Sequence, residues 1–150
     1  MAMGENGRHG TTLRLVIDHD TIEMVGKTYA HATCDTPTIE TRLTARLDHV
    51  VEHDHRIDAI LTVNDVTMTP EAPDVVAIWN RGRGRGQCAT ATWQLGEPQS
   101  VAGGACVAGH RFPDHGAHLV AHVTQQGDTL RLPYPLPGGD GAPIVLTRTQ

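Results

Sequence analysis

The sequence contains few aromatic residues, almost no lysine and no long hydrophobic run. Aromatic residues make up 3% of the 150 residues, and Lys27 is the single lysine among 12 basic residues. No segment approaches the roughly 20 consecutive apolar residues that cross a bilayer as a helix. The first residues also lack the basic and apolar regions of a signal peptide. We therefore expect a cytoplasmic protein without a membrane partner.

Cysteine is scarce as well. The chain has 3 cysteines, Cys34, Cys88 and Cys106, and none of them stands in a Cys-x-x-Cys pair. An odd number of cysteines without a pairing motif is typical of free thiols in a reducing compartment. We expect all three side chains to be unpaired, which agrees with a cytoplasmic location.

Several catalytic and nucleic-acid-binding signatures are missing. The chain has neither a Gly-x-Ser-x-Gly nucleophile elbow nor a phosphate-binding loop that ends in Gly-Lys-Ser or Gly-Lys-Thr. Its formal net charge of −5 provides no basic field to attract nucleic acid. The Arg-Gly repeat at 81–86 has the composition of a nucleic-acid-binding tract, but one short copy favours a hairpin loop or an anion clamp. We expect no nucleic-acid partner.

Short segments of alternating polarity are present along most of the chain. Leu13, Leu15 and Ile17 alternate with polar residues, which is the period of a half-buried strand. Further strands are predicted over 22–33, 57–63, 75–79, 87–95, 101–108, 119–124, 129–132 and 144–147, with turns at 19–20 and 126–128. After a flexible N-terminus at 1–11, residues 12–150 are predicted to form one mainly β domain. We expect an antiparallel β-barrel or sandwich with at most one helix.

Residues 37–53 fit two structures. Ile39, Leu43 and Leu47 lie on one arc of a helix, and Pro37 and the pair at 50–51 also favour a helix. The same segment alternates apolar and polar residues from 39 to 48, as a strand would. We predict the helix, and the strand remains the alternative.

A segment of small residues suggests where a ligand could bind. Residues 101–108 contain Gly103 and Gly104 and almost no large side chain, which leaves room in a sheet either for a ligand or for close packing. His110 and Arg111 follow this segment and would lie at the rim of such a pocket. The apolar walls are predicted to come from Trp79, Trp93 and Tyr134, although burial of both tryptophans in the core is the alternative.

These residues predict a protein that binds a small organic molecule inside a barrel-like β domain. The chemistry we expect, if the protein is an enzyme, is that of a cofactor-independent isomerase or cyclase. His110 would then transfer a proton, and Arg111 would stabilise developing negative charge. No cofactor is predicted for this function.

Two other functions remain open. His53 and His55 lie two residues apart, so that on one strand they would share a face and could ligate a divalent metal ion of a metal-dependent enzyme. Alternatively, the predicted strand at 75–79 is apolar on both sides and would form the face of a homodimer in a non-enzymatic interaction module.

Overall fold

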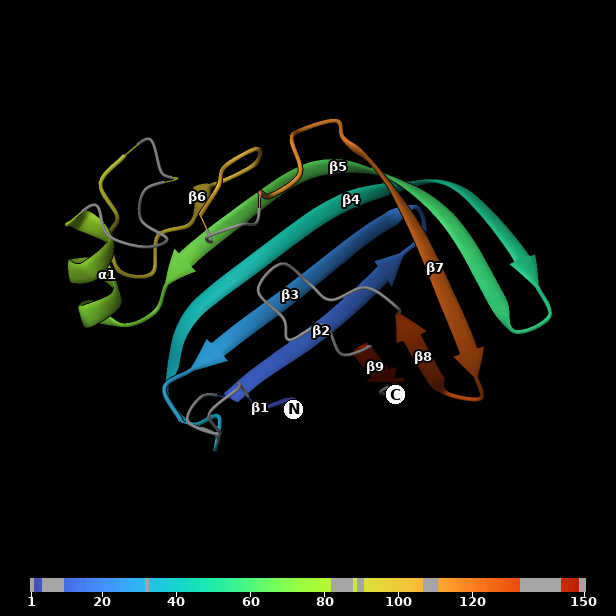
Figure 1. Ribbon diagram of the computed structural model, residues 1–150, viewed down its shortest axis with the longest axis horizontal. Coiled ribbons are helices and arrows are strands. Elements are labelled where there is room, and N and C mark those ends of the chain that lie inside the picture. Colours follow the sequence, from blue (N-terminus) through green and yellow to red (C-terminus); the bar gives the residue numbers. More distant parts are fainter. Residues whose placement is uncertain are drawn as a thin grey trace.

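The structure, a computed structural model, describes residues 2–3, 10–31, 33–81, 88, 91–106, 111–132 and 144–148. They form a single domain that is mainly antiparallel β with one helix, curved into a nearly closed barrel-shaped sheet, as the sequence predicts (Figure 1). The described strands are β1 (Ala2–Met3), β2 (Gly10–Asp18), β3 (Thr21–Tyr29), β4 (Pro37–His53), β5 (Arg56–Pro70), β6 (Gln99–Ser100), β7 (His118–Gln126), β8 (Thr129–Leu132) and β9 (Ile144–Thr147).

The strands are hydrogen-bonded in the order β1-β2-β3-β4-β5-β7-β8-β9, and every neighbouring pair is antiparallel. The short strand β6 pairs with the C-terminal part of β5. β9 comes back to contact β2, so that the sheet curls almost onto itself (Figure 1). The predicted flexible terminus at 1–11 overlaps β1 and the start of β2, and residues 4–9 lie outside the described part of the chain.

Three tight turns join neighbouring strands. Each contains a residue with a positive φ angle, namely His19 at 53°, Asp54 at 45° and Gly127 at 60°. Glycine adopts this left-handed region freely, and histidine and aspartate adopt it more readily than most other residues. The turns predicted at 19–20 and 126–128 are confirmed, and the third turn joins β4 to β5.

Residues 37–53 form strand β4, so the helix predicted for them is wrong. β4 is paired with β3 on one side and with β5 on the other. Its register is interrupted between Leu47 and His49, where Asp48 is inserted as a β-bulge. The bulge brings Leu47 and Val50 to the same face although they lie three residues apart. This spacing of three imitates the period of a helix.

The helix α1 (Pro73–Asn80) lies in the segment that was expected to contain the strand 75–79, and that expectation is wrong. Pro73 is at the first turn, where its missing N–H costs nothing, and Asp74 supplies an acidic side chain to the positive end of the helix. The side chain of Asn80 then makes two hydrogen bonds with the backbone of Trp93, at 2.8 and 3.0 Å. These contacts attach the end of the helix to the chain that follows.

Apolar residues lie on both sides of α1, but only one side packs against the buried core. Val75 and Val76 pack against the buried core, whereas Ile78 on the other side is 49% exposed. The two-sided apolar strand proposed as a homodimer face therefore does not exist. The hairpin loop expected at 81–86 also has a helix, not a strand, before it, and residues 82–87 lie outside the described part of the chain.

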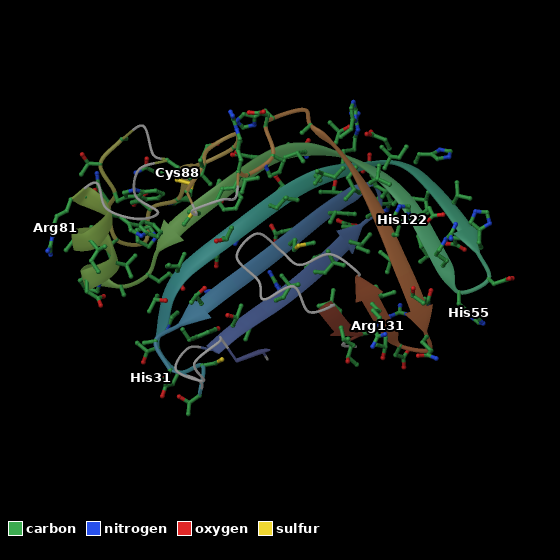
Figure 2. All side chains as sticks on the ribbon, in the orientation of Figure 1. His31, His55, Arg81, Cys88, His122 and Arg131 are labelled. Carbon is green, nitrogen blue, oxygen red and sulfur yellow. A yellow bond between two sulfur atoms is a disulfide. The ribbon has the colours of Figure 1, made fainter. Side chains whose placement is uncertain are left out.

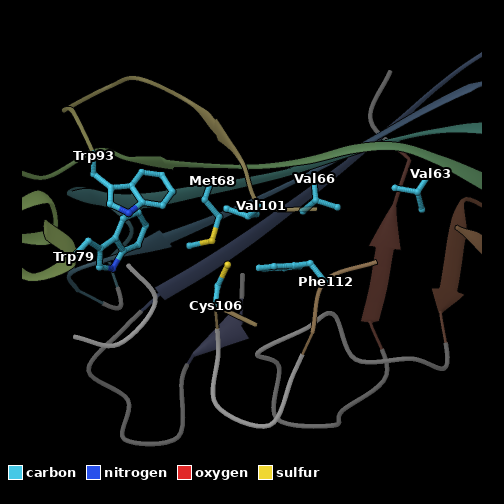
Figure 3. Close-up of a cluster of buried hydrophobic side chains, with 8 residues drawn as sticks. All are labelled: Val63, Val66, Met68, Trp79, Trp93, Val101, Cys106 and Phe112. Carbon is cyan, nitrogen blue, oxygen red and sulfur yellow. The ribbon is translucent and has the colours of Figure 1, made fainter. Parts of the chain in front are cut away.

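The larger buried cluster packs the inner face of β5 against α1 and the segments 91–106 and 111–117, and we call this part of the molecule the core end. Figure 3 shows its eight buried side chains, which are Val63, Val66, Met68, Trp79, Trp93, Val101, Cys106 and Phe112. A smaller cluster of Ile22, Ala45 and Leu61 continues along the same face of the sheet. We define the inner face by these two clusters and the outer face as the opposite one.

A disulfide between Cys88 and Cys106 closes the core end. The expectation that all three cysteines are free is therefore wrong for this pair. Spacing did not suggest the bond, because the two residues are 18 positions apart and the approach of their segments depends on how 91–106 folds over β5.

Candidate functional site

The described part of the small-residue segment, residues 101–106, is closely packed at Val101, Gly104 and Cys106. It is not a strand over the described residues 101–106, and Val101 and Cys106 are each 2% exposed. A Cβ atom added to Gly104 would lie 2.9 Å from the Val101 carbonyl oxygen and 3.0 Å from the Cys88 Cβ. Of the two interpretations of this segment, packing and a pocket, the structure favours packing at Gly104.

Gly103 is constrained in another way. Its φ angle is +71°, and an added Cβ would overlap the Asp114 side chain and lie 3.7 Å from a nitrogen of Arg111. Arg111 is therefore close to Gly103, with its side chain exposed. His110 and Tyr134, the predicted partners of this site, lie outside the described residues.

The two predicted wall residues, Trp79 and Trp93, are core residues. They are 5% and 2% exposed, and their ring centroids lie 4.6 Å apart at an interplanar angle of 58°. A tilted aromatic pair at this separation is a favourable packing arrangement. Their contacts belong to the core end, as Figure 3 shows.

His53 and His55 do not share a strand face. His53 is the last residue of β4, and His55 lies in the turn before β5 begins at Arg56. The register pairs His53 with Arg56 across the hairpin. No group of three His, Cys, Asp or Glu residues within the described ranges could hold a metal ion. The divalent-metal alternative loses the geometry on which it was based.

A groove of about 550 Å³ lies at the other end of the molecule, beside the turns of the β4–β5 and β7–β8 hairpins. We call this part the hairpin end. Figure 2 shows His55 and Arg131 there, far from Arg81 and Cys88 at the core end. The residues that line the groove are His55, Thr124, Gln125, Gln126, Gly127, Thr129, Arg131 and Val145.

The sheet register places the polar lining of this groove on one face. Thr124 of β7 pairs directly with Arg131 of β8, and Arg131 pairs with Val145 of β9. Directly opposed residues of antiparallel strands point to the same side of a sheet. Thr124 also pairs with Arg56 of β5, so these side chains lie on the outer face of the sheet.

Arg131 of β8 differs from basic residues of β3, β4 and β5. Arg42 is paired with two carboxylates, Lys27 with two and Arg56 with one. Arg131 lines the groove, and within the described ranges no carboxylate forms an ion pair with it. A guanidinium in this setting presents its planar set of donors to a ligand.

A histidine–aspartate pair lies next to the groove. His122 of β7 is opposite Asp58 of β5, and its Nδ1 lies 2.6 Å from the Asp58 Oδ1. Arg56 donates to the other oxygen of the same carboxylate at 2.8 Å. The hydrogen bond from His122, and then that from Arg56, lowers the pKa of the Asp58 carboxyl below its ordinary value.

This pair selects one tautomer of the neutral imidazole. Because an ionised carboxylate only accepts hydrogen bonds, Nδ1 of His122 carries the hydrogen, and the lone pair of the neutral ring is on Nε2. His122 is a diagonal neighbour of Arg131 across β7 and β8, where Cα atoms lie roughly 7–8 Å apart. Figure 2 shows His122 on the same half of the molecule as Arg131. The arrangement can hold an anion at Arg131 and accept a proton at His122.

The fold and this site together define a nearly closed antiparallel barrel with a groove at the hairpin end. Searches with the chain found no matching protein-family model and no matching curated protein. No helix within the described ranges has the length and apolar character needed to cross a bilayer.

Sequence reasoning did not select Arg131, Asp58 or His122 for this site. Side chains alternate along a strand, so His118 and His122 are expected on one face of the predicted strand at 119–124. The pairing of β5 with β7 confirms that both lie on the outer face. The pairing of His122 with Asp58 joins residues 64 positions apart. Only the order of the strands reveals it.

Proposed function

We propose that the protein binds a small organic anion in the groove at the hairpin end, with Arg131 holding the acidic group. The observation that carries this proposal is a guanidinium that lines a groove of about 550 Å³ and has no carboxylate partner within the described ranges. Ligand pockets commonly measure about 300–1,000 Å³. Arginine binds carboxylate and phosphate through two parallel hydrogen bonds, which fixes both position and orientation.

The remaining lining suits the body of a small organic molecule. Val145 is 53% exposed and offers an apolar surface beside Arg131. Thr124, Gln126 and Thr129 supply hydroxyl and amide groups that both donate and accept hydrogen bonds. An acid with a short apolar chain would place its carboxylate at Arg131 and its chain along Val145.

His122 gives this binding site a chemical role, which is cofactor-independent proton transfer of the kind used by isomerases and cyclases. The Asp58 carboxylate orients the imidazole 2.6 Å away and stabilises the imidazolium that forms when Nε2 accepts a proton. Arg131 would stabilise negative charge that develops on the substrate. His122 and Arg131 thereby replace His110 and Arg111 as the proposed histidine–arginine pair.

Binding is tested with octanoate, and with octanol as the neutral analogue, in a thermal unfolding assay. Octanoate should raise the melting temperature in proportion to the logarithm of its concentration, and octanol should not. Arg131→Ala should weaken octanoate binding roughly 10- to 100-fold, because a hydrogen bond to a charged group contributes about 1.5–3 kcal/mol. Arg81→Ala, at the core end, is the matched control. Equal binding by Arg131→Ala and the wild type, or no binding by the wild type, would refute the proposal.

Proton transfer is tested separately with levulinate, a small carboxylate that carries a ketone. In D₂O, the protein should accelerate the exchange of the levulinate protons next to the ketone, followed by proton NMR. His122→Gln should remove the acceleration, whereas His118→Gln, on the same face of β7, should keep it. If exchange is equally fast with His122→Gln, the histidine has no part in the chemistry, whatever the outcome of the binding assay.

The structure changes the support for two of three expectations about cofactor, partner and location. The absence of a cofactor agrees with this mechanism, which uses only side chains. A homodimer is no longer supported by the segment 75–79, because that segment is helical. The cytoplasmic location loses the argument from free thiols, because a disulfide such as Cys88–Cys106 is typical of an oxidising compartment.

A further inference from the structure

A second group of polar side chains meets on the outer side of β5, away from the groove. The Ser100 hydroxyl donates to Asp65 Oδ1 at 2.6 Å, and its oxygen lies 3.5 Å from Nε2 of His115. His115 Nε2 and Asp65 Oδ1 are 3.7 Å apart. All three side chains are accessible, since those of His115 and Asp65 are 62% and 36% exposed and Ser100 is exposed too. A hydroxyl, an imidazole and a carboxylate therefore share one accessible site.

A β-bulge in β5 builds this site. Thr44 of β4 pairs with Asp65, and the next residue, Ala45, pairs with Val63. Asn64 is therefore an extra residue in β5. The Asn64 carbonyl oxygen accepts a hydrogen bond from His115 Nδ1 at 2.7 Å. Bulges disrupt the ladder locally and redirect side chains, and they are frequent beside active sites.

The bulge also determines which imidazole nitrogen is basic. A carbonyl oxygen can only accept a hydrogen bond, so Nδ1 of His115 must carry the hydrogen. Nε2 is then the nitrogen with a free lone pair, and it is the atom that faces Ser100. This is the relationship between base and nucleophile that activates a serine hydroxyl.

The other two members of the site are held by backbone contacts. Ser100 belongs to β6 and pairs with Thr67 of β5. Asp65 Oδ1 accepts the N–H of Val66 at 2.8 Å in addition to the Ser100 hydroxyl. The serine oxygen is consequently positioned by strand pairing, and its hydroxyl can rotate between Asp65 and His115.

We propose that Ser100 is a nucleophile, activated by His115, that takes acyl groups from small activated esters. The Ser100 oxygen attacks the ester carbonyl carbon while its proton passes to His115 Nε2, and Asp65 stabilises the imidazolium. The ester bond then breaks, and the leaving alcohol takes the proton from His115. Water, deprotonated by His115, attacks the acyl-serine, which releases the acid and restores the hydroxyl. One ester and one water molecule thus give one acid and one alcohol.

A second hydroxyl–histidine contact provides the matched control. Thr62 Oγ1 lies 3.2 Å from His118, but the nitrogen that it faces is Nδ1, and the same hydroxyl is hydrogen-bonded to Asp48. No backbone carbonyl of the described chain is hydrogen-bonded to the His118 ring, so its tautomer is not fixed as that of His115 is. Thr62 is also a secondary alcohol, which is a more hindered nucleophile than serine.

The test uses a fluorophosphonate probe and p-nitrophenyl acetate on the full chain. The probe should label the folded wild type with loss of fluoride, and mass spectrometry should place the label on Ser100. Ser100→Ala should abolish labelling and ester hydrolysis, His115→Ala should slow both at least tenfold, and Thr62→Ala should leave both unchanged. Labelling that persists in Ser100→Ala, or that is equal in His115→Ala and the wild type, would overturn the proposal.

Two further measurements separate this result from other causes. Thermal unfolding of each variant checks the fold, and Ser100→Thr keeps the hydroxyl with more steric hindrance, so it should react more slowly than wild type yet faster than Ser100→Ala. Octanoate binding in the groove should be equal in Ser100→Ala and the wild type. A wild type that reacts no faster than heat-denatured protein would also overturn the proposal.

Discussion

The two ends of this barrel are built in different ways. At the core end, α1 and a disulfide-closed segment cover the inner face of β5, and buried side chains such as Met68 and Trp93 are 1% and 2% exposed. At the hairpin end, turns and strand ends carry polar side chains around a groove. The difference indicates that stability resides mainly at the core end, whereas the groups that we propose to bind and react lie on the hairpin end and the outer face.

Two glycines, one at the core end and one in the middle of the sheet, have different surroundings. At the core end, Gly104 allows the backbone to approach the disulfide. In the middle of the sheet, Gly26 faces mostly open space, since the nearest described atom to an added Cβ is the Thr41 carbonyl oxygen at 3.9 Å. A glycine therefore does not by itself indicate a ligand site.

The largest effect is expected from truncation at the core end. Trp93→Ala removes a buried ring that packs on Trp79, and it should lower the free energy of unfolding by about 3–5 kcal/mol. Leu95→Ala, at a neighbouring position that is 53% exposed, should change it by no more than about 0.5 kcal/mol. Urea denaturation measures both. Equal losses in the two variants would remove the distinction between the core end and its surface.

Loss of the disulfide should have the next largest effect. Cys88→Ser with Cys106→Ser opens a loop of 18 residues, and the chain-entropy estimate for a loop of this length is about 3 kcal/mol. Thermal unfolding with and without a reducing agent provides the comparison. Reductant should lower the melting temperature of the wild type but not that of the double variant. A wild type that is insensitive to complete reduction would contradict the role given to the bond.

Gly104→Ala should cost about 1–3 kcal/mol, because the added methyl group would overlap the Val101 carbonyl and the disulfide. Gly26→Ala is the matched control in a strand, where alanine costs less conformational entropy than glycine, so this variant should be neutral or slightly stabilising. Chemical denaturation distinguishes the two. A destabilised Gly26→Ala together with an unaffected Gly104→Ala would reverse the assignment of close packing and open space.

The smallest effect concerns the pH dependence at the hairpin end. The pKa of Asp58 is lowered in the folded protein, mainly by His122, so the pair stabilises the fold above the ordinary pKa of an aspartate. This contribution is lost as the pH falls through the lowered pKa. Asp58→Asn should therefore be less stable than the wild type near neutral pH, and the difference should shrink in acid. A difference that stays constant with pH would contradict the ion pair.

Local patterns predicted the β architecture, because alternation is a property of each strand alone. Strand 144–147 agrees with its predicted bounds, and the turns at 19–20 and 126–128 are in place. The errors have specific causes. The bulge at Asp48 imitates a helical spacing in β4, and the strand-favouring residues of 75–79 conceal a helix whose start is signalled by Pro73.

The candidate site was less accessible to sequence reasoning. Asp58 and His122, like Ser100 and Asp65, meet only through the pairing of β5 with β7 and β6, which no local pattern specifies. The predicted site at Gly103 and Gly104 instead followed from residue size. Small size indicates close approach, and it does not distinguish a ligand from a neighbouring backbone.

The central claim is that the hairpin end binds an organic anion while the core end stays closed. An NMR titration of isotope-labelled protein with octanoate tests it most directly. We expect saturable shifts of the amides of Thr124, Gln126, Thr129 and Val145, with none at Val66 or Met68. Shifts confined to the core end, or no saturable shift at any concentration of octanoate, would contradict the account.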